Sequence, residues 1–435
     1  MKTLIHNVEL ITMDKENNQY ADGIILYNDD TIEYAGPASG FDQNELKNSM
    51  EKLQLIDGKG MTALPGFVNA HTHTAMTAFR GYADGQPLWE WLSETIWPME
   101  ERLEPGDTYW LTLLGAAEMI SAGVTTFLDM YMFMTDTARA VSECGMRAVL
   151  SRALMGPDKS TEQRYREVDE LSHWRYKADG RINMMIAPHA VYTCSPELLQ
   201  NCVKLAEKYQ TGIHVHLSET VKEVADSVRE YGKTPPGHLH NLGLFEQPVV
   251  AAHCVHLTHD DMDLMARHNV KAVHCPSSNM KLASGFAPVD EMLERGIVTA
   301  LGTDGAASNN NLSIWKEMSL ASLIAKGHTQ NANALPPVTA MEMATVKGAE
   351  ALMLQDEAGS LEAGKKADIQ LIDTTGPHYH PREDTQVHLV YSGYSHDVNT
   401  VIINGKVVMK DGNLTTIDLD QVYGEVDRII KRIRY

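Results

Sequence analysis

Short apolar segments alternate with longer amphipathic segments through the middle of the chain. The apolar segments have the length of buried parallel strands, whereas the amphipathic ones have the period of helices. Eight strands are predicted: GFVNA (66–70), GVTTFLDM (123–130), RAVLSRALM (147–155), INMMIAPH (182–189), TGIHVHLS (211–218), PVVAAHCV (248–255), VKAVHCPS (270–277) and VTALGTD (298–304). The helices predicted between them include GDTYWLTLLGAAEMISA (106–122), SPELLQNCVKLAEKYQ (195–210), THDDMDLMARH (258–268) and LPPVTAMEMATVKGAEAL (335–352). Eight such strand–helix units predict an α/β fold, a (β/α)8 TIM barrel.

The two ends of the chain have a different pattern, with short strands separated by Asn, Asp and Gly. The strand-rich segments are TLIHNVELITM (3–13), DGIILYNDDTIEYAG (22–36), KKADIQLIDT (365–374) and VNTVIINGKVVMKDG (398–412). Asn404-Gly405 predicts the two-residue turn of a hairpin within the last of them. A charged helix is predicted after it, over 420–435.

These patterns predict one β-sandwich domain made from both ends of the chain, beside the barrel. We expect residues 1–61 to be its N-terminal part. Residues 62–362 would form the catalytic barrel. Residues 363–435 would supply the C-terminal part of the sandwich and the terminal helix.

Composition narrows the classes of partner. The chain has 435 residues, a net charge of −21 and 43% hydrophobic residues, and such an acidic chain does not favour nucleic acid. Its start has no long apolar segment that would suggest a signal peptide, and no apolar run is long enough to span a membrane. The five cysteines include no CxxC pair, which is typical of a protein in a reducing compartment. We therefore expect a cytoplasmic protein with a small-molecule substrate, no nucleic-acid or membrane partner, and a homo-oligomer as an open alternative.

Polar side chains that are unusual for buried strands occur where the predicted strands end. The strand ends carry His71 and His73, then His189, then His214, His216 and Glu219, then His253, and finally Asp304. In a barrel of parallel strands these ends form one rim, on which active sites lie. The sequence therefore predicts that imidazoles and carboxylates from distant segments meet at one place.

Their spacing predicts a metal site. His71 and His73 are two residues apart on a strand, so both imidazoles can point to the same side. His216 would add a third nitrogen and Asp304 an oxygen, which leaves a position for water, as in catalytic sites. We expect one divalent metal per subunit, with zinc as the first choice, although Fe²⁺ or Mn²⁺ would use the same ligands. Water on such an ion ionises near neutral pH and becomes a nucleophile.

Several motifs together resemble the amidohydrolase superfamily, in its branch of adenosine-type deaminases and chlorohydrolases. The motifs are PGFVNAHTH, PLWEWLSETIWPMEERL, HVHLSET, AAHCVHL, HCPSSNMKL and GTDGAASNNNLSIWKEM. The resemblance covers nearly the whole chain. It implies a hydrolase of C–N bonds in cyclic amidines, which converts 5′-methylthioadenosine and S-adenosylhomocysteine to the inosine analogues and ammonia. In that reaction metal-bound hydroxide would attack purine C6.

The resemblance also implies roles for residues at matching positions. The metal ligands would be His71, His73, His216 and Asp304, and the catalytic residues Glu219, His253 and Asp304. The substrate contacts would be Glu100, Arg152, His189, Glu219 and Asp304. Many members of the superfamily hold two metals bridged by a carboxylated lysine after strand four; INMMIAPHAVY has His189 and no lysine there, which indicates a mononuclear site.

The predicted reaction needs protons at two atoms. Glu219 would protonate ring N1, Asp304 would pass the proton of the water to the leaving ammonia, and His253 would stabilise the developing charge. Two alternatives remain open at this point. One is another ring deaminase or chlorohydrolase, of guanine, cytosine or triazine type; the HxxE glutamate favours a deaminase but does not choose the ring. The other is a metal-binding protein without catalysis, since a fold does not fix a function.

Overall fold

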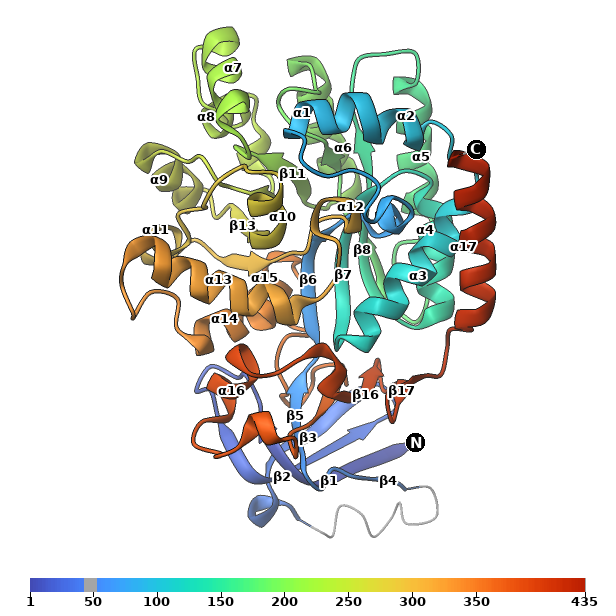
Figure 1. The fold of residues 1–435 in the computed structure, drawn as a ribbon, viewed down its shortest axis with the longest axis vertical. Coiled ribbons are helices and arrows are strands. Elements are labelled where there is room, and N and C mark those ends of the chain that lie inside the picture. The colour runs from blue at the N-terminus through green and yellow to red at the C-terminus, as the bar shows by residue number, and fades with distance from the viewer. Residues whose placement is uncertain (43–52, 435) are drawn as a thin grey trace.

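The computed structural model describes residues 1–42 and 53–434. Its centre is a barrel of parallel strands with helices around it (Figure 1), which confirms the predicted fold class. Each of the eight apolar segments forms a strand at the expected place, since runs of apolar residues can be buried on both faces of a parallel sheet. The barrel strands are β6 (Phe67–Thr72), β7 (Val124–Tyr131), β8 (Arg147–Leu154), β9 (Ile182–Met184) with β10 (Ala187–Pro188), β11 (Ile213–Leu217), β12 (Val249–His253), β13 (Lys271–His274) and β14 (Thr299–Leu301).

These strands pair in two groups that close on each other. β6, β7 and β8 are parallel neighbours, and β9 and β10 both pair with β8. Strands β11 to β14 pair in chain order. The groups meet at a parallel bridge between Ile186 and Ile213. On the other side the backbone N–H of Asp304 donates to the carbonyl oxygen of His71 at 3.0 Å. All carboxyl ends therefore lie on one rim.

Three of the four named helix predictions match single helices, and the fourth is wrong in one respect. Residues 335–352 form two helices, which separate at Thr345 (φ −130°, ψ −95°). The Thr345 hydroxyl donates to the carbonyl oxygen of Met341 at 2.6 Å. The break brings the second helix close to β6, where a Cβ on Gly348 would lie 2.6 Å from Cβ of Val68.

The helices around the barrel follow the strands in chain order. They are α3 (Asp107–Ser121), α4 (Met134–Cys144), α5 (Thr161–Ser172), α6 (Pro196–Tyr209), α7 (Val221–Tyr231), α8 (Pro235–Asn241), α9 (His259–Arg267), α10 (Pro276–Lys281), α11 (Val289–Glu294), α12 (Ala306–Asn309), α13 (Ile314–Thr329), α14 (Pro337–Ala344) and α15 (Val346–Ala351). No helix among the described residues is long and apolar enough to cross a membrane.

A helical segment after β6 crosses the end of the barrel away from the terminal sheet (Figure 1). It begins with α1 (Leu88–Glu90), continues through a π-helical turn (Trp91–Ile96) and ends with α2 (Trp97–Glu100). Because it joins β6 to α3 over the rim, it supplies side chains to the space above the strand ends.

The two ends of the chain meet in one nine-stranded sheet below the barrel (Figure 1), in the order β18-β17-β16-β15-β5-β1-β2-β3 with β4 on β1. β5 and β15 join the ends as antiparallel neighbours, and this association of the two ends was predicted. The strands are β1 (Lys2–Ile11), β2 (Gln19–Asn28), β3 (Thr31–Pro37), β4 (Gln54–Asp57), β5 (Met61–Pro65), β15 (Ile369–Asp373), β16 (Val398–Ile403), β17 (Lys406–Lys410) and β18 (Asn413–Leu414). The domain boundaries after residues 61 and 362 stay predictions.

The predicted hairpin and terminal helix are both present. Asn404 and Gly405 have φ of 51° and 74° between β16 and β17, as the two-residue turn requires. α16 (Thr385–Tyr391) precedes this hairpin. α17 (Leu419–Arg434) follows it and lies along the barrel beside α3 (Figure 1).

A buried ion pair ties the barrel to the terminal sheet. Arg147 is the first residue of β8, and its side chain is 2% exposed. Its Nε donates to Oδ2 of Asp368 at 2.8 Å. A second nitrogen, Nη2, donates to Oδ1 of Asn404 at 3.2 Å, in the hairpin turn. Removing one partner of such a pair leaves a buried charge without compensation.

Replacing Arg147 by alanine should therefore destabilise the protein by about 3–5 kcal/mol. The midpoint of urea unfolding measures this. The control is Lys406→Ala, which removes an exposed pair with Asp179 between the same two parts of the molecule and should cost less than about 1 kcal/mol. Equal losses for both variants would contradict the structural role of the buried pair.

Candidate active site and metal centre

The residues predicted for the site do converge on the rim. His71 lies in β6, His216 in β11 and His253 at the end of β12, while His73 directly follows β6 and Asp304 lies three residues after β14. The i, i+2 spacing in β6 brings the two imidazole centroids to 4.9 Å. Parallel strand order thus collects side chains that are far apart in the sequence.

We call His71, His73, His216 and Asp304 the metal set. Oδ1 of Asp304 lies 3.1 Å from Nε2 of His73 and 3.4 Å from Nε2 of His71. Nε2 of His216 lies 3.3 Å from Nε2 of His73. His71, His73 and Asp304 can thus hold one ion together, and His216 lies beside His73; three imidazoles and one carboxylate are a donor set suited to a divalent transition metal.

Backbone carbonyls hold two of these imidazoles in the form that can bind a metal. Nδ1 of His73 lies 2.5 Å from the carbonyl oxygen of Met130, and Nδ1 of His216 lies 2.8 Å from that of His189. A carbonyl oxygen only accepts, so each Nδ1 carries the proton and each Nε2 can offer its lone pair.

Nε2 of His71 fits the same pattern. It is fully buried and has no hydrogen-bond partner among the described residues. A buried polar atom of this kind is costly unless something else satisfies it. An ion held by the metal set would do so.

The charges of the site also call for a cation. Burial alone would lower the pKa of His73, but hydrogen bonding to Asp304 and its negative charge raise it to about 9. Burial would raise the pKa of Asp304, but hydrogen bonding to His71 and His73 holds it well below the usual range. Positive charge between these groups, as a proton or as a metal ion, is therefore stabilised, and metal binding would release that proton.

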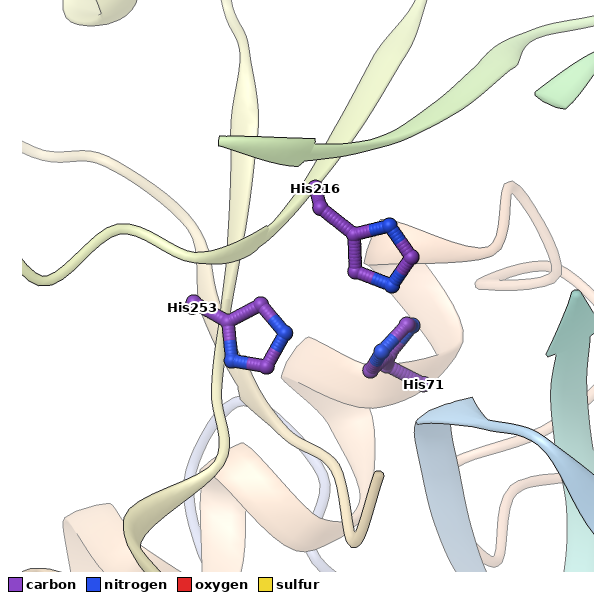
Figure 2. Close-up of side chains that lie close together, drawn as sticks. All are labelled: His71, His216 and His253. Atoms are coloured by element: carbon purple, nitrogen blue, oxygen red, sulfur yellow. The ribbon is translucent and has the colours of Figure 1, made fainter. Parts of the chain in front are cut away.

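His253 belongs to the same cluster of rings. Figure 2 shows His71, His216 and His253 grouped with their rings turned toward one another, and one ring nitrogen of each lies within 4.8 Å of the other two. Nδ1 of His253 lies 2.9 Å from Oδ1 of Asn279, which orients the ring. Nε2 of His253 lies 3.8 Å from Oε2 of Glu219. His253 therefore stands between the metal set and a second carboxyl group.

Glu219 lies just beyond β11. Its side chain is buried, and its Oε1 accepts from the Ser284 hydroxyl at 3.3 Å. The carboxylate of Glu223 accepts from the backbone N–H groups of Ser218 and Glu219 at 3.0 and 2.7 Å. Burial raises the pKa of Glu219 above its usual value, although His253 opposes the shift. A carboxyl group that keeps its proton more readily is suited to act as an acid.

Sequence reasoning missed the residues that hold Asp304. Its Oδ2 accepts from the hydroxyls of Ser278 and Ser308 at 2.6 and 2.8 Å, so Oδ1 is left to face the imidazoles. The signal for them was present in HCPSSNMKL and GTDGAASNN, where small polar residues directly follow two strands. Asn279, which orients His253, lies in the first of these motifs.

Besides Glu219 and Asp304, the three other residues expected to contact substrate lie around the same pocket. Glu100 is at the end of α2, and burial raises its pKa to about 7. Burial lowers the pKa of His189 to about 3, so its ring is neutral. Arg152 reaches the pocket wall with its Nε hydrogen-bonded to Glu167, a partner that the sequence did not reveal.

One pocket contains the side chains predicted to bind the metal, to catalyse and to contact substrate, except His71, which lies behind it. The pocket is lined by His73, Met76, Leu88, Trp91, Leu92, Ile96, Trp97, Glu100, Met130, Tyr131, Met132, Arg152, Ala153, Met155, His189, Tyr192, His216, Glu219, His253, Leu282, Asp304 and Ser308. A wider cavity of about 770 Å³ adjoins it and shares Leu88, Tyr192 and Leu282 with it. The geometry thus offers a polar end, an apolar wall and an outer chamber; the role of each residue stays a prediction.

Comparison with known proteins identifies close relatives of the chain. Residues 62–408 match the model of the amidohydrolase family. The chain is 46% identical to 5-methylthioadenosine/S-adenosylhomocysteine deaminase of Caldanaerobacter subterraneus subsp. tengcongensis over 432 residues, which cover 98% of each chain. It is 47% identical to the protein of the same name from Pelotomaculum thermopropionicum over 431 residues, covering 99% of this chain and 98% of the other.

Solved structures are similar over the same length. An adenosine deaminase from Xanthomonas campestris with bound zinc matches with a TM-score of 0.93 and 32% identity, over 99% of this chain and 98% of that one. A zinc complex of atrazine chlorohydrolase from Arthrobacter aurescens matches with a TM-score of 0.90 and 24% identity, over 98% and 100%. The second likeness concerns the fold alone.

His73→Ala should lower zinc affinity at least about 100-fold, because it removes a nitrogen that lies close to two other members of the metal set. Competition with a chromophoric chelator measures the affinity. His378→Ala is the control, since His378 pairs with Asp397 outside the barrel, and it should leave zinc affinity unchanged. Wild-type affinity in His73→Ala would show that the site has been misplaced.

Proposed function

The chain belongs to the amidohydrolase family, and we propose that within this family it is a metal-dependent deaminase of adenine nucleosides. Its substrates are 5′-methylthioadenosine and S-adenosylhomocysteine, which it converts to the inosine analogues and ammonia. The observation that carries this proposal is 46% identity, over 98% of both chains, to a deaminase named for these two compounds. The likeness to a zinc-bound adenosine deaminase supports the same chemistry.

We propose that the metal set holds one divalent ion, and that the ion is zinc. The similar adenosine deaminase structure contains zinc, and the donor set of three imidazoles and a carboxylate suits it. The position of His189 after β10, where a bridging lysine would stand in a two-metal site, favours a single ion. The bound ion would lower the pKa of a water ligand toward neutrality and so supply hydroxide near pH 7.

The chain's own residues supply the protons. Glu219, buried and with a raised pKa, donates a proton to N1 of the purine as C6 becomes tetrahedral. Asp304 accepts one proton of the attacking water and passes it to the amino group, which leaves as ammonia; the second proton of the water is lost as the C6 carbonyl forms and replaces the one that Glu219 gave to N1. His253 is oriented by Asn279 and hydrogen-bonds the incoming oxygen, where it stabilises the charge that develops.

The rest of the pocket orients the nucleoside. Glu100 accepts hydrogen bonds from the ribose hydroxyls, and Arg152 and His189 contact the nucleoside beside it. Trp91 and Trp97 form part of the apolar wall. The 5′ substituent points to the outer cavity of about 770 Å³, which gives room for a homocysteine group as well as for a methyl. All five cysteines are buried and free, consistent with our expectation of a cytoplasmic enzyme.

A panel of substrates tests the activity. Zinc-loaded protein should release ammonia from 5′-methylthioadenosine and S-adenosylhomocysteine, and their adenine absorbance should shift toward that of hypoxanthine. Guanine, cytosine and a chlorotriazine should react at least about 100-fold more slowly in kcat/KM. Preferential release of ammonia from guanine or cytosine, or of chloride from the triazine, would replace this proposal with one of those activities. No turnover of any compound would favour a binding protein.

Glu219→Gln separates catalysis from metal binding. The amide has the size of the carboxyl group but cannot supply its proton, so kcat should fall by about 10²–10⁴-fold. Zinc affinity should stay within about threefold of wild type, because Glu219 is outside the metal set. Glu197→Gln changes an exposed first-turn glutamate of α6 and should be silent in both assays. Full activity in Glu219→Gln would remove Glu219 from the mechanism.

A further inference from the structure

A further buried histidine lies behind the metal set and takes no part in the mechanism described above. His214 is in β11, two residues before His216, and its side chain is fully buried. Its Nε2 lies 2.8 Å from Nδ1 of His71. The two rings are nearly perpendicular, with an interplanar angle of 80°. The nitrogen of His71 that faces away from the metal set, Nδ1, therefore contacts another imidazole instead of a backbone carbonyl.

The contact continues to a serine and then to the backbone. Nδ1 of His214 lies 3.2 Å from Oγ of Ser151. The same Oγ lies 2.6 Å from the carbonyl oxygen of Asp129. Ser151 is in β8 and Asp129 in β7, and Ser151 is fully buried. From His71 onward, the chain of contacts thus runs across four strands, β6, β11, β8 and β7.

Only one arrangement of protons fits these contacts. A carbonyl oxygen cannot donate, so the Ser151 hydroxyl must give its hydrogen to Asp129. Oγ of Ser151 then acts as the acceptor toward His214, which places the His214 proton on Nδ1. Nε2 of His214 consequently accepts, and the proton of His71 must lie on Nδ1.

This order of protons leaves the lone pair of His71 Nε2 free on the side of the metal set. His73 and His216 reach the same state through backbone carbonyls, from Met130 and His189. His71 differs from these two imidazoles, because its proton position depends on side chains. The protons of those side chains could also be arranged in the opposite direction.

We propose that Ser151 and His214 are positioning residues for the metal ion. They form a hydrogen-bond relay that starts at the carbonyl of Asp129 and keeps the proton of His71 on Nδ1. The relay acts on metal affinity and touches neither substrate nor reacting atoms. This inference rests on the metal set proposed above.

Loss of the serine hydroxyl reverses the relay. In Ser151→Ala, Nδ1–H of His214 would be a buried donor without a partner, which is costly. The other tautomer of His214 avoids this, since its Nε2–H can donate to Nδ1 of His71. The His71 proton then lies on Nε2, where it blocks the ion. Metal binding must reverse this order and should weaken by about 10–100-fold, as is common when a partner of a ligating histidine is lost.

Chelator competition on metal-free wild type, Ser151→Ala and Ser322→Ala tests the relay with zinc as the probe. Ser322 is the matched control: it is also fully buried and its hydroxyl donates to a backbone carbonyl, that of Leu335, at 2.7 Å. It has no contact with the metal set in the described structure. We expect a loss of zinc affinity of at least about tenfold in Ser151→Ala and wild-type affinity in Ser322→Ala.

The outcomes separate the relay from the metal set itself. If wild type binds zinc tightly and both serine variants match it, or lose affinity equally, the relay is overturned while the metal set stands. If wild type binds no zinc, the metal set is overturned and the relay with it.

Neutron diffraction from deuterium-exchanged, metal-free wild-type crystals gives an independent answer that needs no variant to fold. We expect deuterium on Nδ1 of both His71 and His214. Deuterium on Nε2 of His214, directed at His71, would overturn the proposal. In Ser151→Ala crystals the expected deuterium positions are Nε2 of both rings, a change that a merely structural loss of the hydroxyl would not produce.

Discussion

The site depends on the close approach of Asp304 to the imidazoles of His71 and His73 inside a buried rim. Oδ1 of Asp304 lies 3.4 and 3.1 Å from a nitrogen of each imidazole, and such a buried arrangement is stable only when positive charge lies between the groups. A proton can supply this charge, as the raised pKa of His73 indicates, and a divalent cation can supply more of it. The barrel makes the approach possible because parallel strands end on one side, so that segments more than two hundred residues apart meet there.

Around this charged centre, each functional group is oriented by a partner that itself is fixed. Backbone carbonyls orient His73 and His216, two serines hold Asp304, and Asn279 turns His253. The proposed relay does the same for His71. Such partners fix the tautomers and angles of metal ligands and so set both affinity and reactivity. The proposed catalytic arrangement is therefore a property of several strand ends together, and a change at one of them affects the others through the shared centre.

Much of the fold and part of the site could be predicted from the sequence, because they follow from the spacing of residues along the chain. Apolar segments marked the strands, the i, i+2 pair of His71 and His73 marked a shared face, and Asn404-Gly405 marked a hairpin. The missing parts depend on contacts between segments. The break at Thr345 follows from the packing of α15 on β6, and the pairing of Arg152 with Glu167 depends on how α5 lies on β8. Ser278, Ser308 and Ser151 are small polar residues whose partners are known only once neighbouring strands are known.

The central claim is that one ion, held by His71, His73, His216 and Asp304, gives this barrel its chemistry. Anomalous diffraction from zinc-loaded crystals at the zinc absorption edge tests it most directly. We predict a single strong peak on the rim, about 2.0–2.2 Å from one atom of each of the four residues. A peak that lacks one of these ligands, a second peak beside it near His189, or no peak on the rim would contradict the account.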